Sequence, residues 1–265
     1  MPIEGVQRYF KLFENVQNGG LYLKNKIKKQ PQPLTFTTKP FPITFSVPKS
    51  LYLVFKEIFM TDVYDINELV KRLPAKPVVI DIGANVGYFD ILLLSKMQQA
   101  TIYAYEPLPA NTTLLGNTIA ENTLLKESVH LYQMAVTGKP IPSLDLFSED
   151  TSDGQVVASV FSDFNKDNTK KISIPAITLT EVINQIDAPV IDLLKMDCEG
   201  SEYDILYNTP AELIRRVKQM TIEVHDIDKE QNNIHAFNSY LQGLGYDTKF
   251  APINDFCYAL EATKR

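Results

Sequence analysis

Carboxylates stand at or near the ends of three apolar, strand-like runs of this sequence. Asp81 closes the run VVID, Glu106 follows TIYAY, and Asp197 follows LLKM. In an open, mostly parallel sheet, ligands bind in the crevice beyond the carboxyl ends of the strands. We therefore expect these acids to gather around one ligand site.

The turn after the first run has two glycines, Gly83 and Gly87, and leads into an apolar helix. Glycine lets the backbone approach a ligand closely, and Asp81 would face the cationic end of a cofactor. A dinucleotide site uses G-x-G-x-x-G to hold a pyrophosphate, but Asn85 occupies the second glycine position. The pattern favours a zwitterionic nucleoside without phosphates. We expect this nucleoside to contact Asp81, Gly83, Ala84, Asn85 and Gly87.

Glu106-Pro107 ends the second predicted strand, about 25 residues beyond Asp81. An acid at this position can accept hydrogen bonds from ribose hydroxyls, whereas the alternative is an ordinary carboxylate at a strand end. Ala135, in the third predicted strand, could let an adenine ring lie flat, or it could simply pack. Ser159 is a further candidate for cofactor contact.

The fourth and fifth predicted strands end in Asp197 and in Glu223-Val224-His225. A hydroxyl nucleophile is activated either by a positioned base or by a metal ion that lowers its pKa. Asp197, Glu223 and His225 could act in either way, and such ligands suit Mg²⁺, Mn²⁺ or Ca²⁺. The alternative for His225 is a satisfied histidine at a strand end. Glu202 is expected to complement a helix dipole.

Apolar runs alternate with helical segments from residue 76 onward, which predicts βαβ units on a mostly parallel sheet. The predicted strands are residues 78–81, 101–105, 129–136, 190–196 and 220–224, and the predicted helices are 88–97, 111–121 and 203–208. A helix over 234–244 should precede a terminal hairpin of 246–250 and 256–261. Residues 140–175 break this rhythm and predict an insertion, with β-like pieces at 156–161 and 172–174.

Residues 1–75 are predicted to form an N-terminal cap on the α/β domain of residues 76–265. Apolar residues at helical spacing predict an amphipathic first helix whose stripe is a packing surface; they are Val6, Tyr9, Phe10, Phe13 and Val16. Residues 31–50 suggest short edge strands or a hairpin. A run of lysines (Lys24, Lys26, Lys28 and Lys29) is expected to be a solvated segment.

The composition restricts the class of protein. A net charge of −6 and a pI of about 5.2 argue against a nucleic-acid partner. The two cysteines, Cys198 and Cys257, lack metal or disulfide spacing, which is consistent with a reducing cytoplasm. No apolar window is long enough to span a membrane and no signal peptide is evident. The composition does not decide between a monomer and a homo-oligomer.

Taken together, these motifs resemble the FkbM-type S-adenosylmethionine-dependent methyltransferases over residues 46–224. The resemblance rests on DIGANVGY at residues 81–88, EP at 106–107 followed by Asn111, KMDCEGSE at 195–202 and IEVH at 222–225, with EIF at 57–59 and Tyr64 upstream. Family members often have valine and alanine at the positions of Cys198 and Ser201.

That resemblance implies a Rossmann-like class I methyltransferase fold, with a seven-stranded sheet whose last strand is antiparallel. It implies O-methylation of a hydroxyl on a sugar, a glycan or a secondary metabolite. It also implies that Tyr64 is a lid residue from the cap, and that Asp197, Glu223 and His225 form the catalytic cluster.

Two other functions fit parts of the sequence. A nicotinamide-dependent oxidoreductase is disfavoured by the missing middle glycine. A catalytically silent binding or scaffold protein could keep the same fold, although a scaffold needs none of the acids Asp81, Glu106 and Asp197. Ligand binding without turnover would indicate the scaffold.

Overall fold

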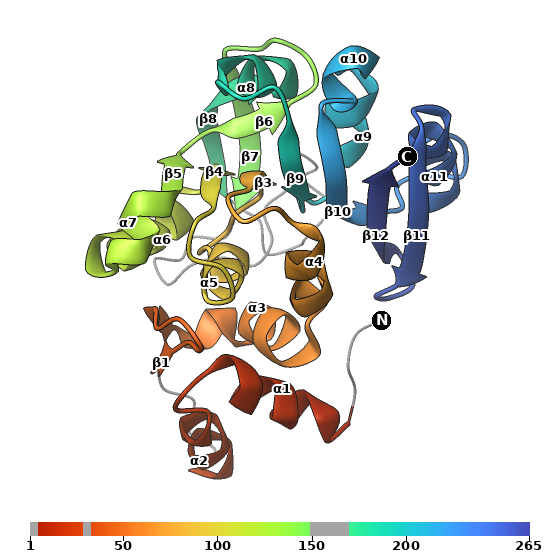
Figure 1. Cartoon of the computed structure of the whole chain (residues 1–265). Helices are drawn as coiled ribbons and strands as arrows, with labels where there is room; N and C mark the ends of the chain where they lie inside the picture. The colour runs from red at the N-terminus through yellow and green to blue at the C-terminus, as the bar shows by residue number, and fades with distance from the viewer. Residues whose placement is uncertain (1–4, 29–32, 149–169) are drawn as a thin grey trace.

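A seven-stranded sheet organises the protein in the computed structural model, which describes residues 5–28, 33–148 and 170–265 (Figure 1). Its strand order is β11-β12-β10-β9-β3-β4-β5. The strands are β3 (Val78–Ile82), β4 (Thr101–Tyr105), β5 (Val129–Tyr132), β9 (Ile191–Met196), β10 (Val217–His225), β11 (Tyr246–Pro252) and β12 (Cys257–Lys264). Pairing is parallel from β5 to β10, and β12 is antiparallel to both of its neighbours. The predicted Rossmann-like class I methyltransferase fold with an antiparallel last strand is confirmed.

Helices cover both faces of the sheet. They are α5 (Tyr88–Leu94), α6 (Pro109–Glu121), α7 (Thr123–Ser128), α8 (Leu179–Gln185), α9 (Glu202–Tyr207), α10 (Ala211–Ile214) and α11 (Ile234–Gly243). Successive strand residues point to opposite faces, so Val79 joins the apolar core on the α5 side, whereas Ile80 joins the core on the α8 and α9 side. The strand order reverses at β3, which creates a crevice beyond its carboxyl end.

The predicted third strand, residues 129–136, is divided in the structure. Tyr105 ends β4 and pairs with Tyr132, the last residue of β5. Beyond this pair β4 offers no further partner, so the chain leaves the main sheet. It forms β6 (Ala135–Thr137) in a second, three-stranded sheet with β7 (Ser143–Ser148) and β8 (Lys170–Thr178). The predicted strand at 156–161 lies outside the described residues.

The described part of the cap contains three separate helices, a hairpin and a continuous helical segment from Lys49 to Thr61. These are α1 (Gln7–Asn15), α2 (Gly20–Lys28), β1 (Leu34–Thr37), β2 (Thr44–Val47), η1 (Lys49–Leu51), α3 (Tyr52–Lys56), η2 (Glu57–Thr61) and α4 (Ile66–Arg72). Aromatic rings pack within the cap and against α5. The ring centroids of Phe55 and Phe36 lie 4.6 Å apart inside the cap, and those of Phe45 in the cap and Tyr88 in α5 lie 5.4 Å apart. Of the helices in the described ranges, none combines the length and apolarity needed to cross a bilayer.

The predicted packing role of the first helical stripe is only partly correct. Val16 is buried and Tyr9 is half-buried, but Val6, Phe10 and Phe13 point to solvent. The reason is that α1 turns a different side inward. Its buried face carries Leu12 and Asn15, and the latter donates from Nδ2 to the carbonyl of Phe59 at 3.0 Å.

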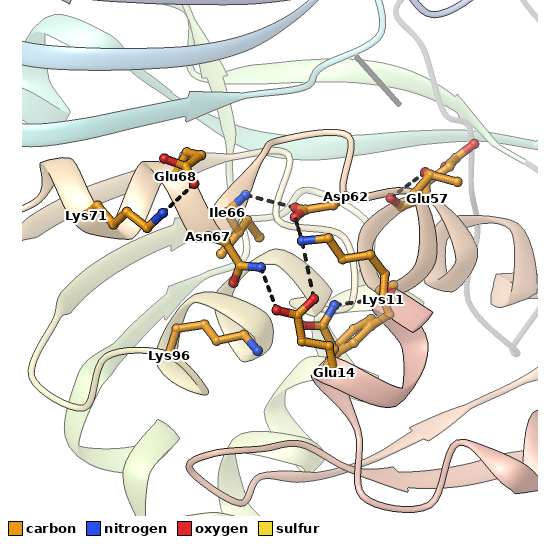
Figure 2. A network of polar contacts seen from close by, with 12 residues as sticks. Lys11, Glu14, Glu57, Asp62, Ile66, Asn67, Glu68, Lys71 and Lys96 are labelled. Carbon is orange, nitrogen blue, oxygen red and sulfur yellow. Dashed lines mark hydrogen bonds and ion pairs between the residues drawn. The ribbon is translucent and has the colours of Figure 1, made fainter. Parts of the chain in front are cut away.

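Polar contacts fix α1 against the segment that precedes α4 (Figure 2). Asp62 accepts from the backbone N–H of Ile66 at 2.8 Å, which satisfies an orphan donor at the start of α4. Its other oxygen lies 3.2 Å from Nζ of Lys11 on α1. Asn67 of α4 donates to Glu14 at 3.4 Å. These contacts tie the first cap helix to the region that holds Tyr64.

Candidate active site

A cavity of about 420 Å³ opens at the carboxyl ends of β3, β4, β9 and β10. This volume lies within the usual range for a small-molecule site. The cap closes one side of the cavity with Val54, Glu57, Ile58 and Tyr64. The rest of the lining comes from the strand ends and the turns that follow them, from α5 and α6, and from β6 and β7. The crevice that the sequence pattern predicts therefore exists.

The β3–α5 turn forms the floor of the cavity. Gly83 has φ +76°, and a Cβ added there would lie 1.8 Å from the backbone oxygen of Asp197. Only glycine fits this contact between the ends of β3 and β9. Asn85 also has a positive φ, of 51°, and its backbone N–H donates to Oε2 of Glu106 at 2.8 Å. Ala84 lines the cavity beside them.

Glu106 is almost fully buried at the end of β4 and still lines the cavity. Its Oε1 accepts from the backbone N–H of Leu108 at 2.9 Å and from Nδ2 of Asn111 at 3.3 Å. Burial raises the pKa of Glu106 to about 7, although these hydrogen bonds act in the opposite direction. The carboxylate is held rigidly and keeps acceptor capacity for hydroxyl groups.

An apolar slot adjoins Glu106. Its residues come from the segment after β4 and from β6 with the residue before it; they are Pro107, Leu108, Met134, Ala135 and Val136. Ala135 contributes the smallest side chain of this slot. Ser159 lies outside the described residues.

Asp81 does not face the cavity, contrary to the expectation that it meets the cationic end of a cofactor. It is completely buried, and its Oδ1 lies 3.0 Å from Nζ of Lys195, its register partner on β9. Burial raises the pKa of Asp81, while the lysine opposes that rise. Asp90 of α5 is also fully buried, and burial together with the charge of Asp81 raises its pKa well above the usual range. Lys195 lines the cavity in place of Asp81 and donates to the carbonyl of Gly83 at 2.7 Å.

Gly87 is likewise absent from the cavity lining within the described part of the chain. It has φ +77°, and an added Cβ would lie 2.4 Å from Cδ1 of Leu115. The structure therefore explains this glycine by close packing of α5 against α6.

Carboxylates gather at the ends of β9 and β10, on the other side of β3 from Glu106. Asp197, Glu199 and Glu223 line this end of the cavity, and Glu57 joins them from the cap. The hydroxyl of Tyr64 donates to Oδ2 of Asp197 at 3.1 Å. Burial, followed by the charge of Asp197, raises the pKa of Glu199 and of Glu223 to about 8.

His225 supplies positive charge beside this acidic end. Its Nδ1 lies 3.1 Å from Oε1 of the fully buried Glu202, and its Nε2 lies 3.5 Å from Oε2 of Glu199. Burial disfavours an imidazolium, but hydrogen bonds with Cys257 and Glu202 and the charge of Glu202 raise the pKa of His225 to about 12. These contacts favour the protonated form of the ring.

The predicted metal ligands are distributed over two groups that share His225. Asp197, Glu199 and His225 offer ligand atoms within 4.8 Å of one another, and so do Glu223, His225 and Cys257. The structure thus adds Glu199 and Cys257 to the predicted set of Asp197, Glu223 and His225.

Several site residues were not predicted from the sequence. Glu202 was expected only to complement a helix dipole, but it also accepts from the backbone N–H groups of Cys198 and Gly200 while it pairs with His225. Cys257 reaches the site because β12 pairs with β10 in a register that sets it opposite His225. No local signal reveals such a long-range register. For Lys195, the sequence does offer a signal, because a charged residue inside an apolar strand is unusual and indicates a buried ion pair or a ligand site.

Comparisons with known proteins agree with this architecture. The sequence model described as Methyltransferase FkbM domain matches residues 81–248. The 31-O-demethyl-FK506 methyltransferase FkbM of Streptomyces tacrolimicus is 24% identical over 217 residues, which cover 73% of this chain and 80% of that protein. The AMB antimetabolite synthetase AmbE of Pseudomonas aeruginosa is 26% identical over 201 residues, which cover 65% of this chain but only 9% of the synthetase.

Among solved structures, the methyltransferase FkbM from Methylobacillus flagellatus KT is 12% identical in sequence. It aligns with a TM-score of 0.48, covering 80% of this chain and 60% of that one.

Proposed function

Because the chain belongs to the methyltransferase FkbM family, we propose that it transfers the methyl group of S-adenosylmethionine to a hydroxyl of a sugar, a glycan or a secondary metabolite. The observation that carries this proposal is a cavity in which an apolar slot beside Glu106 adjoins an acidic cluster at Asp197. The name of the S. tacrolimicus relative, which specifies an oxygen, supports an O-methyltransferase.

The residues around Glu106 fit an adenosyl group. A fixed carboxylate can accept both ribose hydroxyls, the apolar slot beside Ala135 suits a flat adenine, and neither requires a phosphate. Gly83 and Asn85 leave the backbone of the β3–α5 turn open to close approach. We therefore propose Gly83, Ala84, Asn85, Glu106, Pro107 and Ala135 as cofactor contacts, with Asp81 and Gly87 supporting them from behind.

When bound, S-adenosylmethionine supplies a sulfonium methyl group that a nucleophilic oxygen can attack. We propose that Asp197 accepts the proton of the acceptor hydroxyl as the new carbon–oxygen bond forms. The protonated state of His225 disfavours it as the base, so its proposed role is to balance the charge of the surrounding carboxylates. Tyr64 holds the Asp197 carboxylate in place from the cap.

A divalent cation is the alternative means of activating the hydroxyl. The groups Asp197–Glu199–His225 and Glu223–His225–Cys257 could each supply ligands, provided that His225 loses its proton. In that case the cation would replace the imidazolium as the positive charge among these acids. Mg²⁺ and Mn²⁺ are the cations to test, since most of the ligands are oxygen atoms.

An acceptor screen tests the proposed reaction. Wild-type protein and Asp197→Asn are incubated with methyl-labelled S-adenosylmethionine and a panel of sugar and polyketide hydroxyls, each with Mg²⁺, Mn²⁺ or EDTA. We expect label in an O-methyl product with the wild type and a strong loss with Asp197→Asn. Label on nitrogen or carbon would contradict the O-methyltransferase proposal. Cofactor binding without turnover of any acceptor would favour a binding or scaffold protein.

A further inference from the structure

Five large apolar side chains of residues 6–27, the stretch that holds α1 and α2, are exposed to solvent. Val6 and Phe10 are each 70% exposed, Ile27 is 80% exposed, and Phe13 and Leu21 are each 40% exposed. Single exposed apolar residues are ordinary on protein surfaces. Five of them within residues 6–27 are a local concentration, which is typical of an interaction surface.

The first helix presents its apolar residues in a fixed orientation. Lys11 bonds to Asp62 (Figure 2). Asn15 donates to the carbonyl of Phe59, so the opposite side of α1 is anchored. Leu12 is completely buried on that same side. Rotation of α1 to bury Phe10 would break these contacts, and the exposed stripe is therefore a stable feature of the surface.

Positive charge accompanies the apolar side chains. Residues 5–28 contain five lysines and arginines and one acid, Glu14, in a chain whose net charge is −6. Lys24 and Lys26 are exposed, and Nζ of Lys26 donates to the hydroxyl of Tyr9 at 2.8 Å. Within the described ranges, neither lysine forms an ion pair with a carboxylate. Arg8 lies beside the same tyrosine ring.

We propose that α1 and α2 dock the protein onto an anionic lipid surface. Bulky apolar side chains beside basic residues characterise amphipathic helices that lie in the membrane interface, and Lys and Arg near the surface are attracted by anionic headgroups. A second copy of this chain is a poorer partner, because a two-fold contact between these faces would set like charges against each other.

Docking through this surface leaves the cavity accessible. None of the five apolar residues lines the cavity, and α1 and α2 lie at the lower edge of Figure 1, with α3 between them and the sheet. The docking surface is thus separate from the proposed methyl transfer, and loss of one activity does not require loss of the other.

Vesicle sedimentation tests the proposal with the full chain. Phosphatidylcholine vesicles with and without phosphatidylserine are mixed with the wild type or with a variant. The test variants are Phe10→Ser/Ile27→Ser and Lys24→Glu/Lys26→Glu. The control variant is Ile227→Ser, because Ile227 is exposed but lies far from the cap in sequence. We expect wild type and Ile227→Ser to sediment with the anionic vesicles only. Loss of two apolar anchors should lower the bound fraction at least about tenfold, and charge reversal should do the same.

Other outcomes overturn the proposal. Wild type that stays in the supernatant with anionic vesicles would refute lipid docking, as would retained sedimentation of Phe10→Ser/Ile27→Ser. If light scattering instead showed a wild-type dimer that this double variant dissociates, the surface would be an interface between copies. Circular dichroism of each variant establishes that it is folded, and S-adenosylhomocysteine binding should be unchanged in all of them.

Discussion

Replacing Lys195 with methionine tests the buried pair beneath the β3–α5 turn. The substitution keeps the volume and the apolar stem but leaves Asp81 in a fully buried position without its counter-ion. Removal of one partner from such a pair costs ~3–5 kcal/mol. For a chain of this size, that loss corresponds to a decrease in Tm of roughly 6–20 °C.

The pH dependence identifies the cause. Without Lys195, the pKa of Asp81 in the folded protein rises still further above its value in the unfolded chain. A carboxyl with a raised folded pKa costs little when both states are protonated, and its cost grows as pH rises through the interval between the two pKa values. The destabilisation of Lys195→Met should therefore be larger at pH 8 than at pH 5.

Urea denaturation at both pH values provides the measurement, and Lys195→Met/Asp81→Asn is the matched control. The double variant has no unpaired charge at this position, so it should recover much of the lost stability. A loss below about 1 kcal/mol in the single variant would contradict the expected cost of leaving Asp81 buried without its counter-ion. Equal losses at pH 5 and pH 8, or a double variant in which the losses simply add, would refute it as well.

Three further predictions concern the site. Asp197→Asn should lower kcat by at least about 100-fold while leaving S-adenosylhomocysteine affinity within a few-fold; an unchanged kcat would contradict the proposed role. Glu202→Gln removes the charge that supports the imidazolium, so the pKa of His225, read by NMR titration, should fall from about 12; an unshifted titration would mean that Glu202 does not set it. Gly83→Ala should lower the free energy of unfolding by at least ~2 kcal/mol, because its φ is positive and its Cβ would meet the backbone of Asp197. Gly243→Ala, which meets no neighbour, is the control and should be neutral or slightly stabilising, and equal effects of the two would contradict the close approach.

Much of the fold could be predicted because its signals are local. The apolar runs that form β3, β4 and β9 are bounded by polar turns, and the strand at 101–105 has the same bounds in the structure. Glycine positions and strand-end acids identified the cavity for the same reason. The division of β5 from β6 was missed, because the run 129–136 stays strand-like while only its neighbour β4 ends.

Side-chain partners were harder to predict, since they depend on register between distant segments. Asp81 has the position of a cofactor contact in the sequence, but the pairing of β3 with β9 sets it against Lys195. The same limit applies to Cys257, which meets His225 through β10–β12 pairing. The apolar stripe of α1 has helical spacing whether it faces the core or solvent, so its spacing could not decide between packing and exposure.

Calorimetric titration shows whether this cavity binds the cofactor, with S-adenosylhomocysteine as the ligand, NADH as the comparison ligand and Glu106→Gln as the variant. We expect micromolar binding of S-adenosylhomocysteine only. Since ionised Glu106 is the form that accepts both ribose hydroxyls, affinity should fall by up to about tenfold per pH unit below its pKa of about 7, and Glu106→Gln should bind more weakly with little pH dependence. Absence of binding by the folded wild-type protein, or tighter binding of NADH, would contradict the assignment of this cavity to S-adenosylmethionine.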